Sequence, residues 1–97
     1  MANYLVVYKG GGTPVTEEEG KAVMAAWRAW FGELGSAVVE IGAPVGASRS
    51  VGGNGSAGLS GYSVLTASDL DSAVDLTKNC PILAGGGSLE VYEAIEM

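Results

Sequence analysis

Hydrophobic residues in this chain gather in short runs, separated by stretches rich in glycine and polar residues. Short runs of β-branched and aromatic side chains predict strands. Such runs cover residues 4–8, 37–41, 59–66 and 89–95, with a weaker candidate at 47–51. The first run is apolar at every position, which is typical of a strand covered on both faces.

A longer stretch has its apolar residues at helical spacing and predicts a helix from Thr16 to about Leu34. Thr16 and Glu19 fit a capping box at its start, and Gly35 is placed to end it in the left-handed conformation. The inner stripe of this helix is Val23, Trp27, Trp30 and Leu34.

A second helix is predicted over about residues 70–79. Ser68 or Asp69 can cap its first turn, and Pro81 marks its end. The glycine-rich segments 52–58 and 81–88 are predicted to form a flexible turn and a loop.

The resulting order is β-α-β-β-β-α-β, in which one middle strand is uncertain. Right-handed crossovers place both helices on one face of an antiparallel sheet, so we expect an α+β, ferredoxin-like sandwich formed by residues 1–97 as one domain. The other face of such a sheet has no cover within the chain. Because monomers rarely expose large apolar patches, we expect two sheets to pack face to face in a homodimer, or in a higher oligomer.

Composition narrows the class of protein further. The 97 residues are 47% hydrophobic and 16% charged, which is typical of a folded domain and not of a disordered chain. The net charge of −6 argues against nucleic acid as a partner. With one cysteine, Cys80, no export signal and no run of 18 apolar residues, we expect a cytoplasmic protein without a membrane segment.

The sequence resembles the YCII-related (DGPF-type) family nearly end to end. The matching segments are residues 4–8, Trp27 to Trp30, Leu34-Gly35, 61–73, Pro81 and 89–92. The resemblance implies a dimeric α/β barrel of ferredoxin-like subunits. The family's Asp-Gly-Pro-Phe segment should fall near residues 51–58, where this chain has Gly-Gly-Asn-Gly-Ser-Ala-Gly instead. Some relatives use a His–Asp pair, and this chain has no histidine, so the resemblance carries no catalytic residue across.

Without histidine, acid–base catalysis would need a carboxyl group whose pKa is raised by burial, or a lysine whose pKa is lowered by burial. Glu40 and Glu90 are the candidates, and Glu90 is the better one because Tyr92 points the same way along its strand. Solvated carboxylates at a strand edge are the ordinary alternative. We expect no metal site and no cofactor, because histidine is absent and cysteine occurs once. Cys80 itself is expected to be an inert, buried thiol.

Aromatic residues from several elements are the remaining signal. Tyr8, Tyr62 and Tyr92 could line a ligand pocket, and Arg49 could anchor an anion there. The ordinary alternatives are core or dimer-interface packing for the tyrosines and a surface position for the arginine. The glycines of 53–58 match a dinucleotide fingerprint, but the strand predicted after them favours a hairpin turn.

Three functional hypotheses follow. The first is a small-molecule-binding α/β-barrel dimer with lost or weak catalysis, and its ligand-binding candidates are Tyr8, Arg49, Tyr62, Glu90 and Tyr92. The second is a non-catalytic oligomeric interaction module. The third is a cofactor-free isomerase or oxygenase that uses a buried glutamate. A cavity of roughly 300 Å³ or more favours the first or the third.

Overall fold

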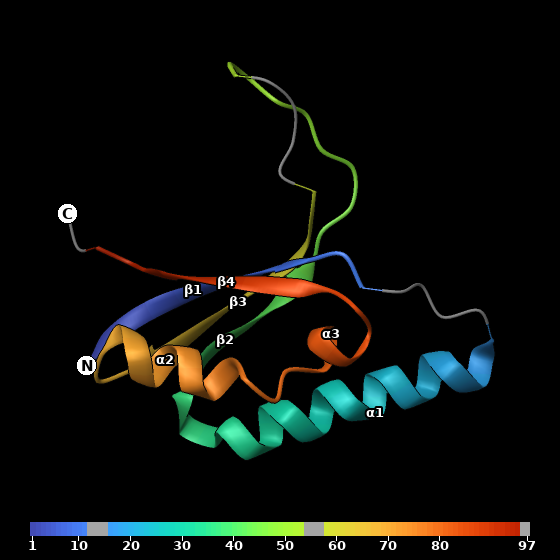
Figure 1. Cartoon of the computed structure of the whole chain (residues 1–97), viewed down its shortest axis with the longest axis horizontal. Helices are drawn as coiled ribbons and strands as arrows, with labels where there is room; N and C mark the ends of the chain where they lie inside the picture. Colours follow the sequence, from blue (N-terminus) through green and yellow to red (C-terminus); the bar gives the residue numbers. More distant parts are fainter. Residues whose placement is uncertain (12–15, 54–57, 96–97) are drawn as a thin grey trace.

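The chain folds as an α+β structure built on an antiparallel sheet (Figure 1). The computed structural model describes residues 1–11, 16–53 and 58–95. Their elements are β1 (Ala2–Lys9), α1 (Glu17–Leu34), the 3₁₀ turn η1 (Gly35–Ala37), β2 (Val38–Pro44), β3 (Leu59–Ala67), α2 (Leu70–Thr77), α3 (Pro81–Ala84) and β4 (Ser88–Glu93). The four strands of this part of the chain have the order β2-β3-β1-β4. This order and the helices on one face (Figure 1) are compatible with the predicted ferredoxin-like sandwich.

Both long helices begin where the sequence predicts. Thr16 Oγ1 accepts a hydrogen bond of 3.1 Å from the backbone N–H of Glu19, and Asp69 Oδ1 accepts one of 2.7 Å from that of Ser72. Helix α1 ends at Leu34, and Gly35 follows as its C-cap. Its φ of 54° is positive, but its ψ of −122° lies outside the left-handed helical region, so the predicted left-handed cap is wrong in ψ. Helix α2 ends at Thr77, two residues before the predicted end.

Two predictions for the middle and end of the chain were wrong. Residues 47–51 form no strand, because the chain leaves the sheet after Pro44 (Figure 1) and the last ladder contact is Val45 N–H to Ser60 C=O, 3.1 Å. Segment 81–88 contains the short helix α3, because the fixed φ of Pro81 suits the first helical position. Residues 54–57 of the predicted turn lie outside the described residues.

The core lies between the helices and one face of the sheet. It joins Val6, Tyr8 and Leu65 from the central strands to Trp30 of α1 and to Cys80, all 5% exposed or less. Trp30 Nε1–H also donates a hydrogen bond of 3.2 Å to the carbonyl of Leu76. This contact ties the end of α1 to α2.

The other face of the sheet carries no helix (Figure 1). Within one chain, helices therefore cover β1 on one face only. Val7 is nevertheless only 7% exposed, since its cross-strand partners are Tyr62 and Glu90. Leu5, between Val64 and Tyr92, is 37% exposed. We call this surface, formed by Leu5, Val7, Tyr62, Val64, Glu90 and Tyr92, the open face.

None of the helices in the described part of the chain is both long and apolar enough to cross a membrane.

Candidate functional site

A pocket of about 380 Å³ lies between helix α1 and the sheet. Helix α1, the end of β1, strands β2 and β3 and helix α3 all contribute residues to its wall. Its volume is within the range of ligand sites in proteins. We call it the α1 pocket.

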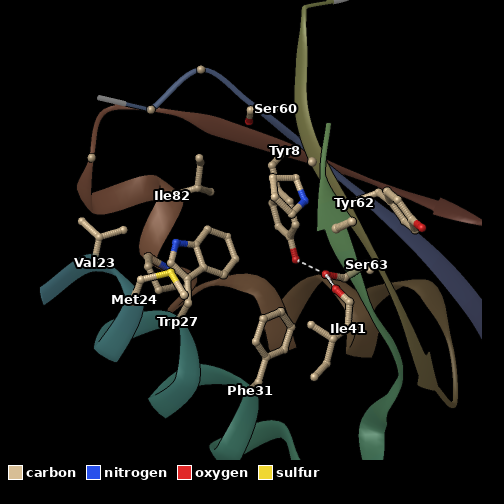
Figure 2. A pocket seen from close by; sticks show the side chains of 18 residues that line it. Tyr8, Val23, Met24, Trp27, Phe31, Ile41, Ser60, Tyr62, Ser63 and Ile82 are labelled. Carbon is tan, nitrogen blue, oxygen red and sulfur yellow. Dashed lines mark hydrogen bonds between the residues drawn. The ribbon is translucent and has the colours of Figure 1, made fainter. Parts of the chain in front are cut away.

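One wall of the α1 pocket is aromatic. The Trp27 ring meets the Tyr8 ring edge to face, with centroids 5.0 Å apart and planes at 78°. The ring centroid of Phe31 lies 5.9 Å from that of Trp27, on the same helix. Val23 and Met24, one turn earlier, are 42% and 55% exposed and complete the helical side of the pocket (Figure 2).

In the wall opposite helix α1, two glycines, Gly42 and Gly61, allow strands β2 and β3 to approach each other closely. A Cβ on Gly42, whose φ is +82°, would lie 1.8 Å from the carbonyl oxygen of Tyr62. A Cβ on Gly61 would lie 3.1 Å from the Ala43 carbonyl oxygen and 3.4 Å from the Tyr8 ring. Backbone therefore forms much of this wall, and the Tyr8 ring packs directly beside it.

A short chain of hydrogen bonds supplies the polar groups of the pocket. The Tyr8 hydroxyl donates to Ser63 Oγ at 2.8 Å, and the Ser63 hydroxyl donates to the Ile41 carbonyl at 2.6 Å. Figure 2 shows Tyr8 and Ser63 side by side, with the rings of Trp27 and Phe31 nearby. Burial raises the pKa of Tyr8 to about 12, so its phenol stays neutral at physiological pH.

The remaining lining is uncharged. None of the described residues that line the pocket is an Asp, Glu, Lys or Arg. Ser60 also lines it, and in the described part of the chain its Oγ is the buried side-chain oxygen without a hydrogen-bond partner. The pocket thus suits an uncharged ligand whose surface is mainly apolar.

The structure brings together only part of the predicted candidate set. Tyr8 lines the α1 pocket with its side chain. Tyr62 belongs to the same wall, but its ring points away from Tyr8 (Figure 2), toward the open face. Tyr92 lies on the open face, and Arg49 is exposed on the segment after β2, where its guanidinium donates to the Ser48 carbonyl at 2.9 Å. The predicted cluster of three tyrosines and an arginine is therefore not formed within one chain.

On the open face, the Glu90 carboxylate contacts two polar side chains, those of Lys9 and Tyr92. Lys9 Nζ lies 2.9 Å from Glu90 Oε1, and the Tyr92 hydroxyl donates to the same oxygen at 2.9 Å. The predicted alignment of Glu90 with Tyr92 is confirmed. The hydrogen bonds from Lys9 and Tyr92 lower the pKa of Glu90, so the expectation of a carboxyl group with a raised pKa is wrong at this residue. Glu40, the other candidate, is exposed on β2.

Cys80 is buried at 2% exposure in the core. Burial raises the pKa of its thiol to about 11, which suppresses the reactive thiolate at neutral pH. Among the described residues, no three side chains of His, Cys, Asp or Glu are grouped so that they could hold a metal ion.

The sequence reasoning missed the residues that shape the polar end of the pocket. Ser63 sits in a strand of alternating burial, and its position on the inner face could have marked it as a buried hydroxyl in need of a partner. The role of the Ile41 carbonyl depends on irregular pairing between β2 and β3, and Gly42, at the register shift, is a signal of it in the sequence.

Comparison of the sequence with protein-family models and with curated proteins finds no match in either set. The resemblance to the YCII-related family therefore remains a prediction from the residues named above.

Proposed function

We propose that this protein binds a small, mainly apolar molecule in the α1 pocket, as a homodimer of ferredoxin-like subunits. The observation that carries the proposal is the pocket itself, about 380 Å³ with aromatic, aliphatic and glycine walls. A dry apolar cavity of about 150 Å³ is enough to bind benzene. The α1 pocket has room for a larger aromatic or alicyclic body.

The titratable groups favour binding over acid–base catalysis. The pKa of Tyr8 rises to about 12 and that of Cys80 to about 11, while that of Glu90 falls. Each shift moves its group further from neutrality, whereas a general acid or base works best with a pKa near the operating pH. A binding protein with lost or weak catalysis is accordingly preferred to an enzyme that uses Glu90.

The open face supports the dimer within this proposal. Its central side chains are apolar; Leu5, on the central strand β1, is 37% exposed, and Tyr92, on the edge strand β4, is 51% exposed. Packing this face on a second copy would remove that surface from water and would form the barrel of the YCII-related family. The Lys9–Glu90 ion pair gives each subunit a polar contact at the same face. The expected cytoplasmic location belongs to the same proposal.

The two tryptophans offer a direct test. Trp27 lines the pocket, whereas Trp30, on the same helix, does not line it and donates to Leu76. In ¹⁵N-labelled protein titrated with naphthalene, we expect the indole N–H signal of Trp27 to shift with saturation and that of Trp30 to shift less. Trp27→Phe assigns the two signals. No saturable shift, or a larger shift at Trp30, would contradict binding in this pocket.

A further inference from the structure

The hydrogen bonds at the polar end of the α1 pocket run in one direction only. A backbone carbonyl accepts hydrogen bonds and cannot donate them, so the Ser63 hydroxyl must donate its one proton to the Ile41 carbonyl. In its contact with Tyr8, Ser63 Oγ can then act only as the acceptor. The Tyr8 hydroxyl is the donor and uses its one proton in this hydrogen bond. Reversing the chain would leave the Ile41 carbonyl without this donor.

This direction decides what Tyr8 can offer to a ligand. With its proton engaged, the phenolic oxygen has only lone pairs left, and it acts as an acceptor. Tyr8 is 5% exposed and Ser63 is fully buried, so water competes poorly for this oxygen. A ligand atom that approaches the Tyr8 oxygen must therefore donate a hydrogen bond.

The surroundings restrict the ligand further. The described lining residues include no cation that could pair with a carboxylate or phosphate. Burying an unpaired anion there would be costly. The Tyr8, Trp27 and Phe31 rings form a wall that suits a flat apolar body (Figure 2).

We propose that the ligand of the α1 pocket is a neutral, mainly aromatic molecule with an O–H or N–H group that donates a hydrogen bond to the hydroxyl oxygen of Tyr8. The proposal rests on the proposed function and adds to it the polarity of the ligand. An ether, ester or carboxylate of the same shape lacks the donor that this position requires.

The test compares four probes with one carbon skeleton: naphthalene, 2-naphthol, 2-methoxynaphthalene and 2-naphthoate. Their dissociation constants are measured by ligand-observed NMR. We expect 2-naphthol to bind about fivefold more tightly than 2-methoxynaphthalene, as for one net hydrogen bond. We expect 2-naphthoate to bind at least about tenfold more weakly than 2-naphthol, because its charge has no partner.

Tyr8→Phe removes the acceptor and keeps the ring. We expect the variant to bind 2-naphthol and 2-methoxynaphthalene with about equal affinity, so that the preference for 2-naphthol is lost. The matched control is Tyr4→Phe, the same change on the same strand at a buried residue that does not line the pocket, and it should keep the preference.

The outcomes separate this inference from the proposed function. If naphthalene binds but 2-naphthol has no preference, or keeps it in Tyr8→Phe, the donor assignment is wrong and the binding function stands. If none of the four probes binds, both proposals are wrong.

Discussion

Tyr8 donates its hydroxyl proton to Ser63 across 2.8 Å, although 55 positions separate the two residues in the sequence. The Ser63 hydroxyl in turn donates a hydrogen bond to the Ile41 carbonyl, so two side-chain hydrogen bonds connect the adjacent strands β1, β3 and β2. A buried hydroxyl pair of this kind has a consequence for stability, because each oxygen is costly to leave unpaired.

Ser63→Ala should destabilise the fold by about 1–3 kcal/mol, because it leaves the buried Tyr8 hydroxyl without its acceptor. Urea unfolding measures the change. Ser60→Ala is the matched control in the same strand: the Ser60 hydroxyl has no partner in the described structure, so its removal should change stability by less than about 0.5 kcal/mol or increase it. Equal losses in the two variants would contradict the role given to Ser63.

Alkaline pH should destabilise the protein. Burial raises the pKa of Cys80 from 9.0 to about 11 and that of Tyr8 from 10.0 to about 12. The unfolded chain loses these protons first, so the stabilisation is complete below about pH 9 and is lost as the pH rises through about 12. Urea midpoints measured between about pH 8 and 11 should fall, and the fall should be smaller in Tyr8→Phe/Cys80→Ala. The same slope in both proteins would refute the assignment.

Gly42→Ala should destabilise the protein by at least about 2 kcal/mol. The new Cβ would collide with the Tyr62 carbonyl, and φ at Gly42 is +82°. Gly46→Ala is the control, since no atom lies within 4 Å of its Cβ position and no positive φ is required there; we expect a change below about 0.5 kcal/mol. Thermal unfolding of the two variants decides whether β2 depends on this glycine.

The dimer can be tested on the open face. Leu5→Asp places a charge at the centre of the proposed contact, on a side chain that is already 37% exposed in the single chain. Light scattering at micromolar concentration should give twice the chain mass for the wild-type protein and the single mass for the variant. Val51→Asp, at a residue that is 99% exposed outside the sheet, should stay dimeric. A wild-type monomer would leave the open face without the partner proposed for it.

The sequence predicted most of the elements because their signals are local. Thr16, Asp69 and Gly35 act within one turn of their own helix. The candidate site was harder to predict because side-chain direction depends on strand register. Tyr8 lies opposite Gly61, and Tyr62 lies opposite Val7, the residue before Tyr8. The two tyrosines are thus one register position apart, so their rings lie on opposite faces of the sheet. The Tyr8 ring therefore lies on the side of the α1 pocket, whereas the side chains of Tyr62, Tyr92 and Glu90 lie on the open face.

The course of β2 and its irregular pairing with β3 explain why the strand predicted at 47–51 was wrong and why the Ser63–Ile41 contact was missed. The predicted strand at 47–51 finds no partner, because the chain leaves the sheet after Pro44; the register shifts between β2 and β3 lie earlier, between Val38 and Ala43. The same shifts bring the Ile41 carbonyl to Ser63. Gly42 marks the irregular position in β2, but its residue type does not show which strand lies opposite, because the bulge depends on contacts between distant segments.

Filling the α1 pocket tests the central proposal most directly. Met24 lines the pocket and is 55% exposed, so Met24→Trp can occupy the space without disturbing the core. Ala25→Trp, one residue along the same helix at an exposed position outside the lining, is the control. In naphthalene titrations we expect Met24→Trp to weaken binding at least about tenfold and Ala25→Trp to leave it unchanged. Equal affinity in both variants, or no binding to the wild-type protein, would contradict the account.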